Sequence, residues 1–122
     1  MHHIDRSLIV VEDEPLICVM IEEMVQDLGW AVEGCAHTEA SAFDLLNSST
    51  PGLVLLDINL GLTTSLGVAA SCQDRRIPIV FMTGCIARDI PSQCGDAPVV
   101  TKPFTEEQLD HAIRRALDSV DA

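Results

Sequence analysis

The sequence predicts an α/β fold in which helices cover both faces of a parallel β-sheet. Short apolar segments rich in β-branched residues alternate with segments whose apolar residues have helical spacing. Three of the apolar segments lack the polar alternation of a half-exposed strand, as is typical of strands buried on both faces. Charged residues stand at the ends of three apolar segments: Glu12 and Asp13 after Leu8–Val11, Asp57 after Leu53–Leu56, and Lys102 after the segment that contains Val99 and Val100. Such a pattern favours a polar site at the carboxyl ends of parallel strands.

Five short strands are expected. Their predicted ranges are Ser7–Val11, Trp30–Ala36, Leu53–Leu56, Ile79–Met82 and Val99–Thr101. A loop at residues 48–52, rich in Ser, Thr, Pro and Gly, precedes the third strand, and Pro78 introduces the fourth. The regular alternation with helical segments leaves no linker, repeat or low-complexity stretch, so residues 1–122 are expected to form a single domain.

Three helices are expected between the first four strands, over residues 15–28, 38–47 and 62–74. Pro15 opens the first, because a proline in the first turn gives up no helical hydrogen bond, and Gly29 closes it. Thr38 is expected to cap the second, whereas Gly67 weakens the third. The expected inner face of the first helix consists of Ile17, Met20, Ile21, Met24 and Leu28.

The last helix has the clearest signal. Thr105 and Gln108 fit a capping box, and apolar residues trace one face from Leu109 to Val120. The region from Thr83 to Pro98 is different, because its Pro and Gly residues break helical periodicity. A short helical turn or an irregular loop is predicted there.

Composition excludes several classes of function. The 122 residues carry a net charge of −12, which is unsuitable for binding a phosphate backbone, so no nucleic-acid partner is expected. No apolar stretch approaches the length of a membrane span. The five cysteines are scattered and form no CxxC pair, which indicates a reduced, cytoplasmic chain. His37 and His111 are interpreted as isolated surface residues.

Five polar residues lie at or just past the predicted strand ends: Glu12, Asp13, Asp57, Thr83 and Lys102. Because parallel strands end at the same edge of a sheet, these side chains are expected to converge. Clustered carboxylates suit Mg²⁺, which prefers oxygen ligands. A lysine and a hydroxyl beside them suit a phosphoryl group, so the sequence predicts a Mg²⁺-assisted phosphoryl acceptor.

The order of Glu12-Asp13, Asp57, Thr83 and Lys102-Pro103-Phe104 resembles the receiver domain of bacterial two-component response regulators, over essentially the whole chain. The resemblance implies a flavodoxin-like (βα)5 three-layer sandwich with the parallel strand order 2-1-3-4-5. It implies that Asp57 accepts the phosphoryl group. Because the resemblance covers essentially the whole chain, a stand-alone receiver without an output domain is expected.

The resemblance further implies a metal site and a phosphoryl site. Mg²⁺ would be held by Asp13, by Asp57, by the Asn59 backbone carbonyl and, through water, by Glu12. Thr83 would be the switch hydroxyl. Lys102 would bind the phosphoryl group and be followed by a cis peptide bond.

The chain also departs from the usual receiver pattern. Val99 stands where most receivers have an aromatic residue, three positions before Lys102. The stretch Phe81-Met82-Thr83-Gly84 resembles the atypical "FATGUY" receivers, which have a reduced fourth helix, but Cys85 stands where their aromatic residue should be. How such a chain switches is left open by the sequence.

The resemblance implies as partners a histidine kinase or histidine phosphotransfer protein and a downstream protein, or else a role as a phosphate sink. The chain is accordingly expected to be no enzyme beyond its own phosphorylation and acyl-phosphate hydrolysis. Two alternatives stay open: a pseudo-receiver that binds without being phosphorylated, and a Mg²⁺-dependent phosphohydrolase. The phosphohydrolase is disfavoured, because Asn59 stands where it would need an acid/base carboxylate.

Overall fold

The computed structural model describes residues 6–84 and 94–121. The elements follow in the order β1 (Ser7–Val11), α1 (Pro15–Asp27), β2 (Ala31–Ala36), α2 (Glu39–Ser48), β3 (Leu53–Asp57), β4 (Asn59–Leu60), β5 (Thr63–Thr64), α3 (Leu66–Asp74), β6 (Ile79–Thr83), β7 (Val99–Thr101) and α4 (Glu106–Asp121). The first, second and third predicted strands are β1, β2 and β3, and the fourth and fifth are β6 and β7.

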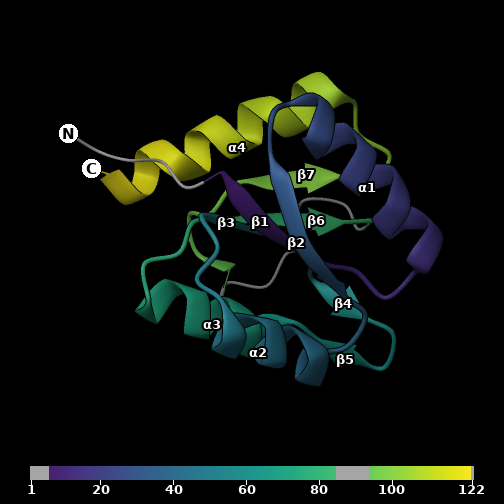
Figure 1. Cartoon of the computed structure of the whole chain (residues 1–122), viewed down its shortest axis with the longest axis vertical. Helices are drawn as coiled ribbons and strands as arrows, with labels where there is room; N and C mark the ends of the chain where they lie inside the picture. Colours follow the sequence, from purple (N-terminus) through teal and green to yellow (C-terminus); the bar gives the residue numbers. More distant parts are fainter. Residues whose placement is uncertain (1–5, 85–93, 122) are drawn as a thin grey trace.

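Five strands form one parallel sheet in the order β2-β1-β3-β6-β7. This is the predicted 2-1-3-4-5 order, with β2 and β7 at the edges. Helices α1 and α4 cover one face, and α2 and α3 cover the other (Figure 1). The sheet therefore has its chain reversal beside β1 and β3, which places a crevice at their carboxyl ends.

The strands β1, β3 and β6 are buried along their whole length. Their side chains alternate between two hydrophobic layers, because successive residues of a strand point to opposite faces. On β1, Ile9 and Val11 pack on the α2/α3 side, whereas Leu8 and Val10 pack on the α1/α4 side. Burial on both faces explains why these strands read as continuous apolar runs.

The predicted caps of two helices are present. Thr38 Oγ1 accepts a hydrogen bond from the Ser41 backbone N–H at 3.1 Å at the start of α2. Ahead of α4, Thr105 Oγ1 accepts from Gln108 N at 3.1 Å, and Gln108 Oε1 accepts from Thr105 N at 2.9 Å. The capping box predicted for the last helix is thus confirmed.

The third helix was predicted to start too early. It begins at Leu66 rather than Leu62, because β4 and β5 form a small antiparallel hairpin ahead of it. Gly61 lies in the turn of this hairpin with φ +69, a left-handed conformation that glycine adopts without strain.

The prediction for α1 was wrong at one position. Met20 is 52% exposed, because the buried stripe of the helix runs through Cys18, Ile21 and Val25 instead. Ile17, Met24 and Leu28 are partly buried at the edges of this stripe.

Most of the region predicted to hold a short or irregular fourth helix lies outside the described residues, as does Cys85. The described chain resumes in a turn at residues 94–96, where Gly95 has φ +60. Among the helices that the structure describes, none combines the length and the apolar character needed to cross a membrane.

Candidate functional site

Two carboxylates and one ammonium meet at the carboxyl edge of the sheet. Glu12 follows β1, Asp57 ends β3, and Lys102 follows β7. Lys102 Nζ lies 2.9 Å from Glu12 Oε2 and 2.5 Å from Asp57 Oδ2. Lys102 thus links two carboxylates that are far from it in the sequence, Glu12 at 90 positions and Asp57 at 45 positions.

Burial disfavours the charged forms of the residues in this cluster. The Glu12 side chain is fully buried, and burial together with the nearby Asp57 carboxyl raises the pKa of Glu12 to about 7, although Lys102 acts in the opposite direction. Burial disfavours the Lys102 ammonium as well. Its hydrogen bonds to Asp57 and Glu12 outweigh that effect, so the pKa of Lys102 is raised.

The residues present fit a hard divalent cation. Carboxylate oxygens of Glu12, Asp13 and Asp57 all lie within 4.8 Å of one another. Glu12 Oε1 is buried and has no hydrogen-bond partner among the described residues. A buried acceptor without a donor is costly, and a cation with oxygen preference would satisfy it.

The loop after β3 shapes the site around Asp57. The Asn59 backbone N–H donates to Asp57 Oδ1 at 3.1 Å, while the Asn59 residue itself is exposed. A Cβ atom at Gly61 would lie 3.7 Å from Asp13 Oδ2, so the hairpin turn passes close to the acidic group. The role expected of the Asn59 carbonyl stays a prediction.

Thr83 is buried at the end of β6. The Thr83 carbonyl accepts a hydrogen bond from Lys102 N at 2.8 Å. The preceding residue, Met82, lies opposite Asp57 in the β3–β6 pairing. The backbone of the predicted switch residue is thus tied to the lysine, while the function of its hydroxyl stays a prediction. The Lys102–Pro103 peptide bond is cis, as expected from the resemblance.

Val99, at the position of the usual aromatic residue, is half-buried and pairs with Phe81 across β6 and β7. A valine, rather than an aromatic ring, therefore pairs with β6 at this position of the edge strand. Cys85 lies outside the described residues.

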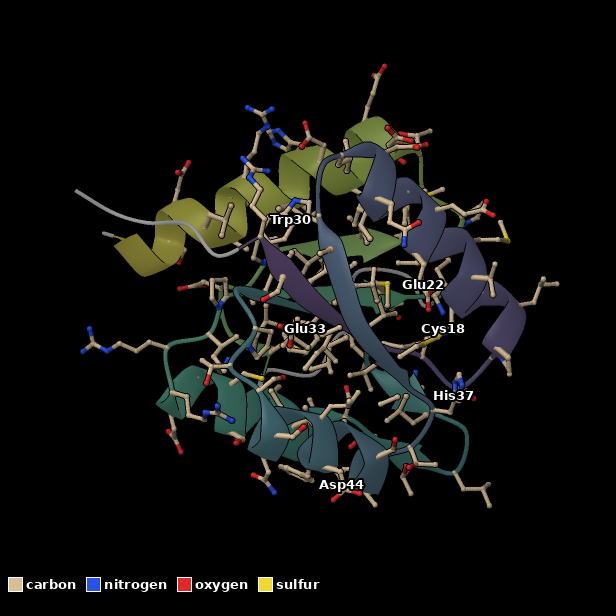
Figure 2. The ribbon with its side chains drawn as sticks, viewed as in Figure 1. Cys18, Glu22, Trp30, Glu33, His37 and Asp44 are labelled. Carbon is tan, nitrogen blue, oxygen red and sulfur yellow. A yellow bond between two sulfur atoms is a disulfide. The ribbon has the colours of Figure 1, made fainter. Side chains whose placement is uncertain are left out.

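Sequence reasoning missed a second cluster beside the first. Cys18 and Cys35 form a disulfide, and His37 lies next to them, its Nδ1 being 3.9 Å from Cys18 Sγ (Figure 2). The prediction that the cysteines are reduced is thus wrong for this pair, because the β1–β2 pairing brings the first turn of α1 onto the end of β2. His37 is exposed but not isolated. The available signal was topological, since Cys18 follows β1 and Cys35 lies near the carboxyl end of β2, the neighbouring strand.

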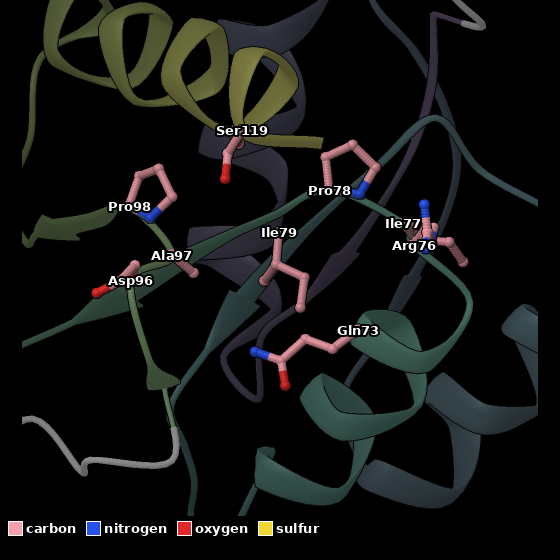
Figure 3. Close-up of a pocket in the computed structure, with 10 residues that line it drawn as sticks. Gln73, Arg76, Ile77, Pro78, Ile79, Asp96, Ala97, Pro98 and Ser119 are labelled. Carbon is pink, nitrogen blue, oxygen red and sulfur yellow. The ribbon is translucent and has the colours of Figure 1, made fainter. Parts of the chain in front are cut away.

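A cavity of about 370 Å³ lies elsewhere, between the starts of β6 and the ends of α3 and α4 (Figure 3). Its lining includes Pro78 just before β6, Ile79 at the start of β6, Pro98 before β7 and Ser119 from α4. None of the predicted site residues does, so this cavity is separate from the acidic cluster.

The chain matches the family model of the response regulator receiver domain over residues 8–114. It is 30% identical over 118 residues to the transcriptional regulatory protein PdtaR of Mycobacterium tuberculosis, covering 93% of this chain and 58% of that protein. It is 32% identical to the phyllosphere-induced regulator PhyR of Methylorubrum extorquens, covering 91% of this chain and 43% of that protein. The chain thus spans about half the length of these relatives.

Solved structures agree with this assignment. The solution structure of SdrG from Sphingomonas melonis superposes with a TM-score of 0.84 at 33% identity, covering 95% of this chain and 99% of that one. The response regulator PhyR from Brucella abortus gives a TM-score of 0.82 at 32% identity, covering 98% of this chain and 51% of that one. With its flavodoxin-like sheet order and its acidic site, the chain belongs to the receiver domain family of two-component response regulators.

Proposed function

We propose that the chain is a phosphorylation-dependent regulator whose Asp57 carboxylate accepts a phosphoryl group from a histidine kinase or histidine phosphotransfer protein. The observation that carries this proposal is the placement of Asp57 beside Lys102 and two further carboxylates at the open edge of the sheet. A nucleophilic carboxylate needs positive charge nearby, both to approach a phosphoryl group and to stabilise the product.

The side chains suggest how the transfer proceeds. An Asp57 oxygen forms a bond to phosphorus while the bond from phosphorus to the donor's imidazole nitrogen breaks, and the imidazole takes up a proton. Lys102 also binds Glu12, so it keeps a partner when Asp57 shifts to engage phosphorus. The Asn59 N–H, which donates to Oδ1, orients the carboxylate. Thr83 is the proposed hydroxyl donor to a phosphoryl oxygen.

A Mg²⁺ ion fits the acidic group formed by Glu12, Asp13 and Asp57. When bound by these carboxylates and the Asn59 carbonyl, it would supply positive charge against the phosphoryl oxygens. This role matches the buried Glu12 Oε1 that accepts no hydrogen bond in the described chain.

We place the donor protein on α1. Leu16, Val19 and Met20 are large apolar side chains that are at least half exposed. Met20 lines an apolar groove of about 340 Å³ together with Phe104 and Lys102 itself. Since this groove reaches the lysine of the site, a protein seated on it would bring its phosphohistidine to Asp57. Exposed apolar patches of this kind are typical of protein contacts.

The phosphorylated chain would act through contact with a downstream protein, or as a phosphate sink, in the cytoplasm. One protein of similar structure is the anti-anti-sigma factor PhyR from Bartonella quintana, which makes a protein target rather than nucleic acid the preferred kind of partner. That these residues act without an output domain stays a prediction.

The test is an intact-mass measurement after incubation with Mg²⁺ and acetyl phosphate. A single phosphoryl adduct is expected on the wild type and on Asp74→Asn, an exposed acidic control on α3, but not on Asp57→Asn. Leaving out Mg²⁺ should also abolish the adduct. No adduct with any small donor would overturn the proposal and favour a pseudo-receiver, whereas continued turnover of phosphate esters would favour a phosphohydrolase.

A further inference from the structure

The Cys18–Cys35–His37 cluster is attached directly to the backbone of Glu12. The Glu12 carbonyl oxygen lies 2.9 Å from His37 Nδ1. Because a carbonyl oxygen can only accept a hydrogen bond, His37 Nδ1 carries the hydrogen. The same oxygen lies 3.6 Å from Cys18 Sγ. Glu12 N donates a hydrogen bond to the carbonyl of Ala36 at 2.9 Å, and Ala36 lies between Cys35 and His37 in the sequence. The backbone of a site residue is thus held by the segments that carry the two cysteines.

The two cysteines differ in access. Cys18 is 2% exposed in the first turn of α1, whereas Cys35 is half-buried on the edge strand β2. Their Cα atoms are 6.6 Å apart, within the range of protein disulfides. Cys72 and Cys94 are buried free thiols, and burial raises the pKa of Cys72 to about 11. Among the described cysteines, only the first pair is placed for thiol chemistry.

We propose that Cys18 and Cys35 form a reversible redox site that controls how fast Asp57 is phosphorylated. This inference rests on the proposed phosphorylation of Asp57. The oxidant class is a small disulfide, such as glutathione disulfide. Cys35 attacks one of its sulfurs and releases one thiol; Cys18 then attacks the mixed disulfide and releases the second. The protein loses two thiol hydrogens and two electrons, which reduce the small disulfide to two thiols.

The coupling follows from the Glu12 carbonyl. In the reduced chain the Cys18 thiol carries a hydrogen that can be donated to this oxygen, in addition to the bond from His37. In the disulfide that hydrogen is gone, and α1 is tied covalently to β2. The loop from Glu12 to Pro15, which carries Asp13, lies between these anchors and is less free to adjust. The reduced chain is therefore the faster phosphoryl acceptor, by about three- to tenfold, as expected for one hydrogen bond at the site.

The test equilibrates the full chain in glutathione buffers of different redox ratio. Alkylation followed by intact mass counts the free thiols, and peptide mass spectrometry identifies the linked pair. Each sample is then phosphorylated with acetyl phosphate and Mg²⁺, and the rate is read from intact mass. Oxidation should hide two thiols, link Cys18 to Cys35 and slow adduct formation. Cys35→Ser should keep the reduced rate in every buffer. Cys85→Ser, a control at a cysteine outside the described residues, should keep the redox response.

Three outcomes would overturn the proposal. The first is equal phosphorylation rates in the two redox states, and the second is a redox response that is lost in Cys85→Ser but kept in Cys35→Ser. The third is a reduced chain that holds one Zn²⁺ on Cys18, Cys35 and His37 and resists oxidation by glutathione disulfide. The last result would assign the cluster to metal binding. Failure of the proposed function is read separately, because no adduct would then form in either state while the thiol count still reports the disulfide.

Discussion

At the scale of single residues, Glu12 is the most heavily constrained group in the site. It is fully buried, one oxygen binds Lys102, and the other has no hydrogen-bond partner in the described chain. An ionised carboxylate in this position is expensive without further positive charge. Glu12 therefore makes the metal-free site less stable when it ionises, and a bound cation should reverse that effect.

This gives a pH prediction. The pKa of Glu12 is about 7 in the folded chain, above its ordinary value of 4.5. The folded state therefore holds this proton more tightly, and the resulting stability, complete below pH 4.5, is lost as the pH rises through about 7. Between pH 5 and pH 8 in EDTA, the free energy of unfolding of the wild type should fall relative to Glu12→Gln, on the order of 1–3 kcal/mol. Urea unfolding measures it.

The matched control is Glu14→Gln, at an exposed residue of the same loop. It should follow the wild type at both pH values. A wild-type chain whose stability changes with pH in parallel with Glu12→Gln would show that the Glu12 proton is not linked to folding.

At the scale of elements, α1 serves both the core and the surface. Its buried stripe of Cys18, Ile21 and Val25 faces the sheet, and its outer side carries the exposed Leu16 and Met20. The sequence suggested that Met20 faces the core, because Met20 and Met24 both fit helical spacing. Periodicity predicts that a helix has an apolar stripe. When apolar residues occur on all sides of the helix, it does not predict which of them face the core.

The exposed side of α1 leads to a prediction about phosphoryl transfer. Met20→Ala should slow transfer from a phosphorylated kinase or phosphotransfer protein by about tenfold, because an apolar anchor of the proposed docking groove is lost. Phosphorylation by acetyl phosphate should be unchanged, since a small donor needs no docking surface. Gln26→Ala, exposed on the same helix but outside the groove, serves as the control. Equal slowing with both donors would mean that Met20 acts on the chemistry rather than on docking.

Elements with a strong local signal were predicted well. The strands β1 and β7 have the predicted bounds, and the Thr105–Gln108 capping box is present. The β4–β5 hairpin was missed, because two-residue strands carry no periodicity. In the site, Glu12, Asp57 and Lys102 converge because parallel strands end together. The Cys18–Cys35 contact depends on the register between β1 and β2, which no local pattern encodes.

At the scale of the whole molecule, the net charge of −12 on 122 residues is the dominant long-range feature. Repulsion among surface carboxylates opposes the compact state, and it acts over distances that salt can screen. The contact of Lys102 with buried carboxylates is short and shielded, so it is screened far less. Added salt should therefore stabilise the chain.

The corresponding measurement is the Tm at rising KCl concentration, without divalent ions. From about 0.01 M to about 0.15 M KCl, the Tm should rise, because the Debye length shrinks from about 30 Å to about 8 Å. A falling Tm would mean that attractive surface ion pairs outweigh the repulsion. Sodium chloride serves as the control for a specific effect of potassium and should give the same slope.

The alternation of side chains along the central strands divides the interior in two. On β3, Val54 and Leu56 belong to the layer beneath α2 and α3, while Leu53 and Leu55 belong to the layer beneath α1 and α4. Adjacent residues of one strand thus pack in separate hydrophobic layers. Substitutions in the layer beneath α1 and α4 can therefore be accommodated without changes in the layer beneath α2 and α3, provided the polar edge that both layers share is kept.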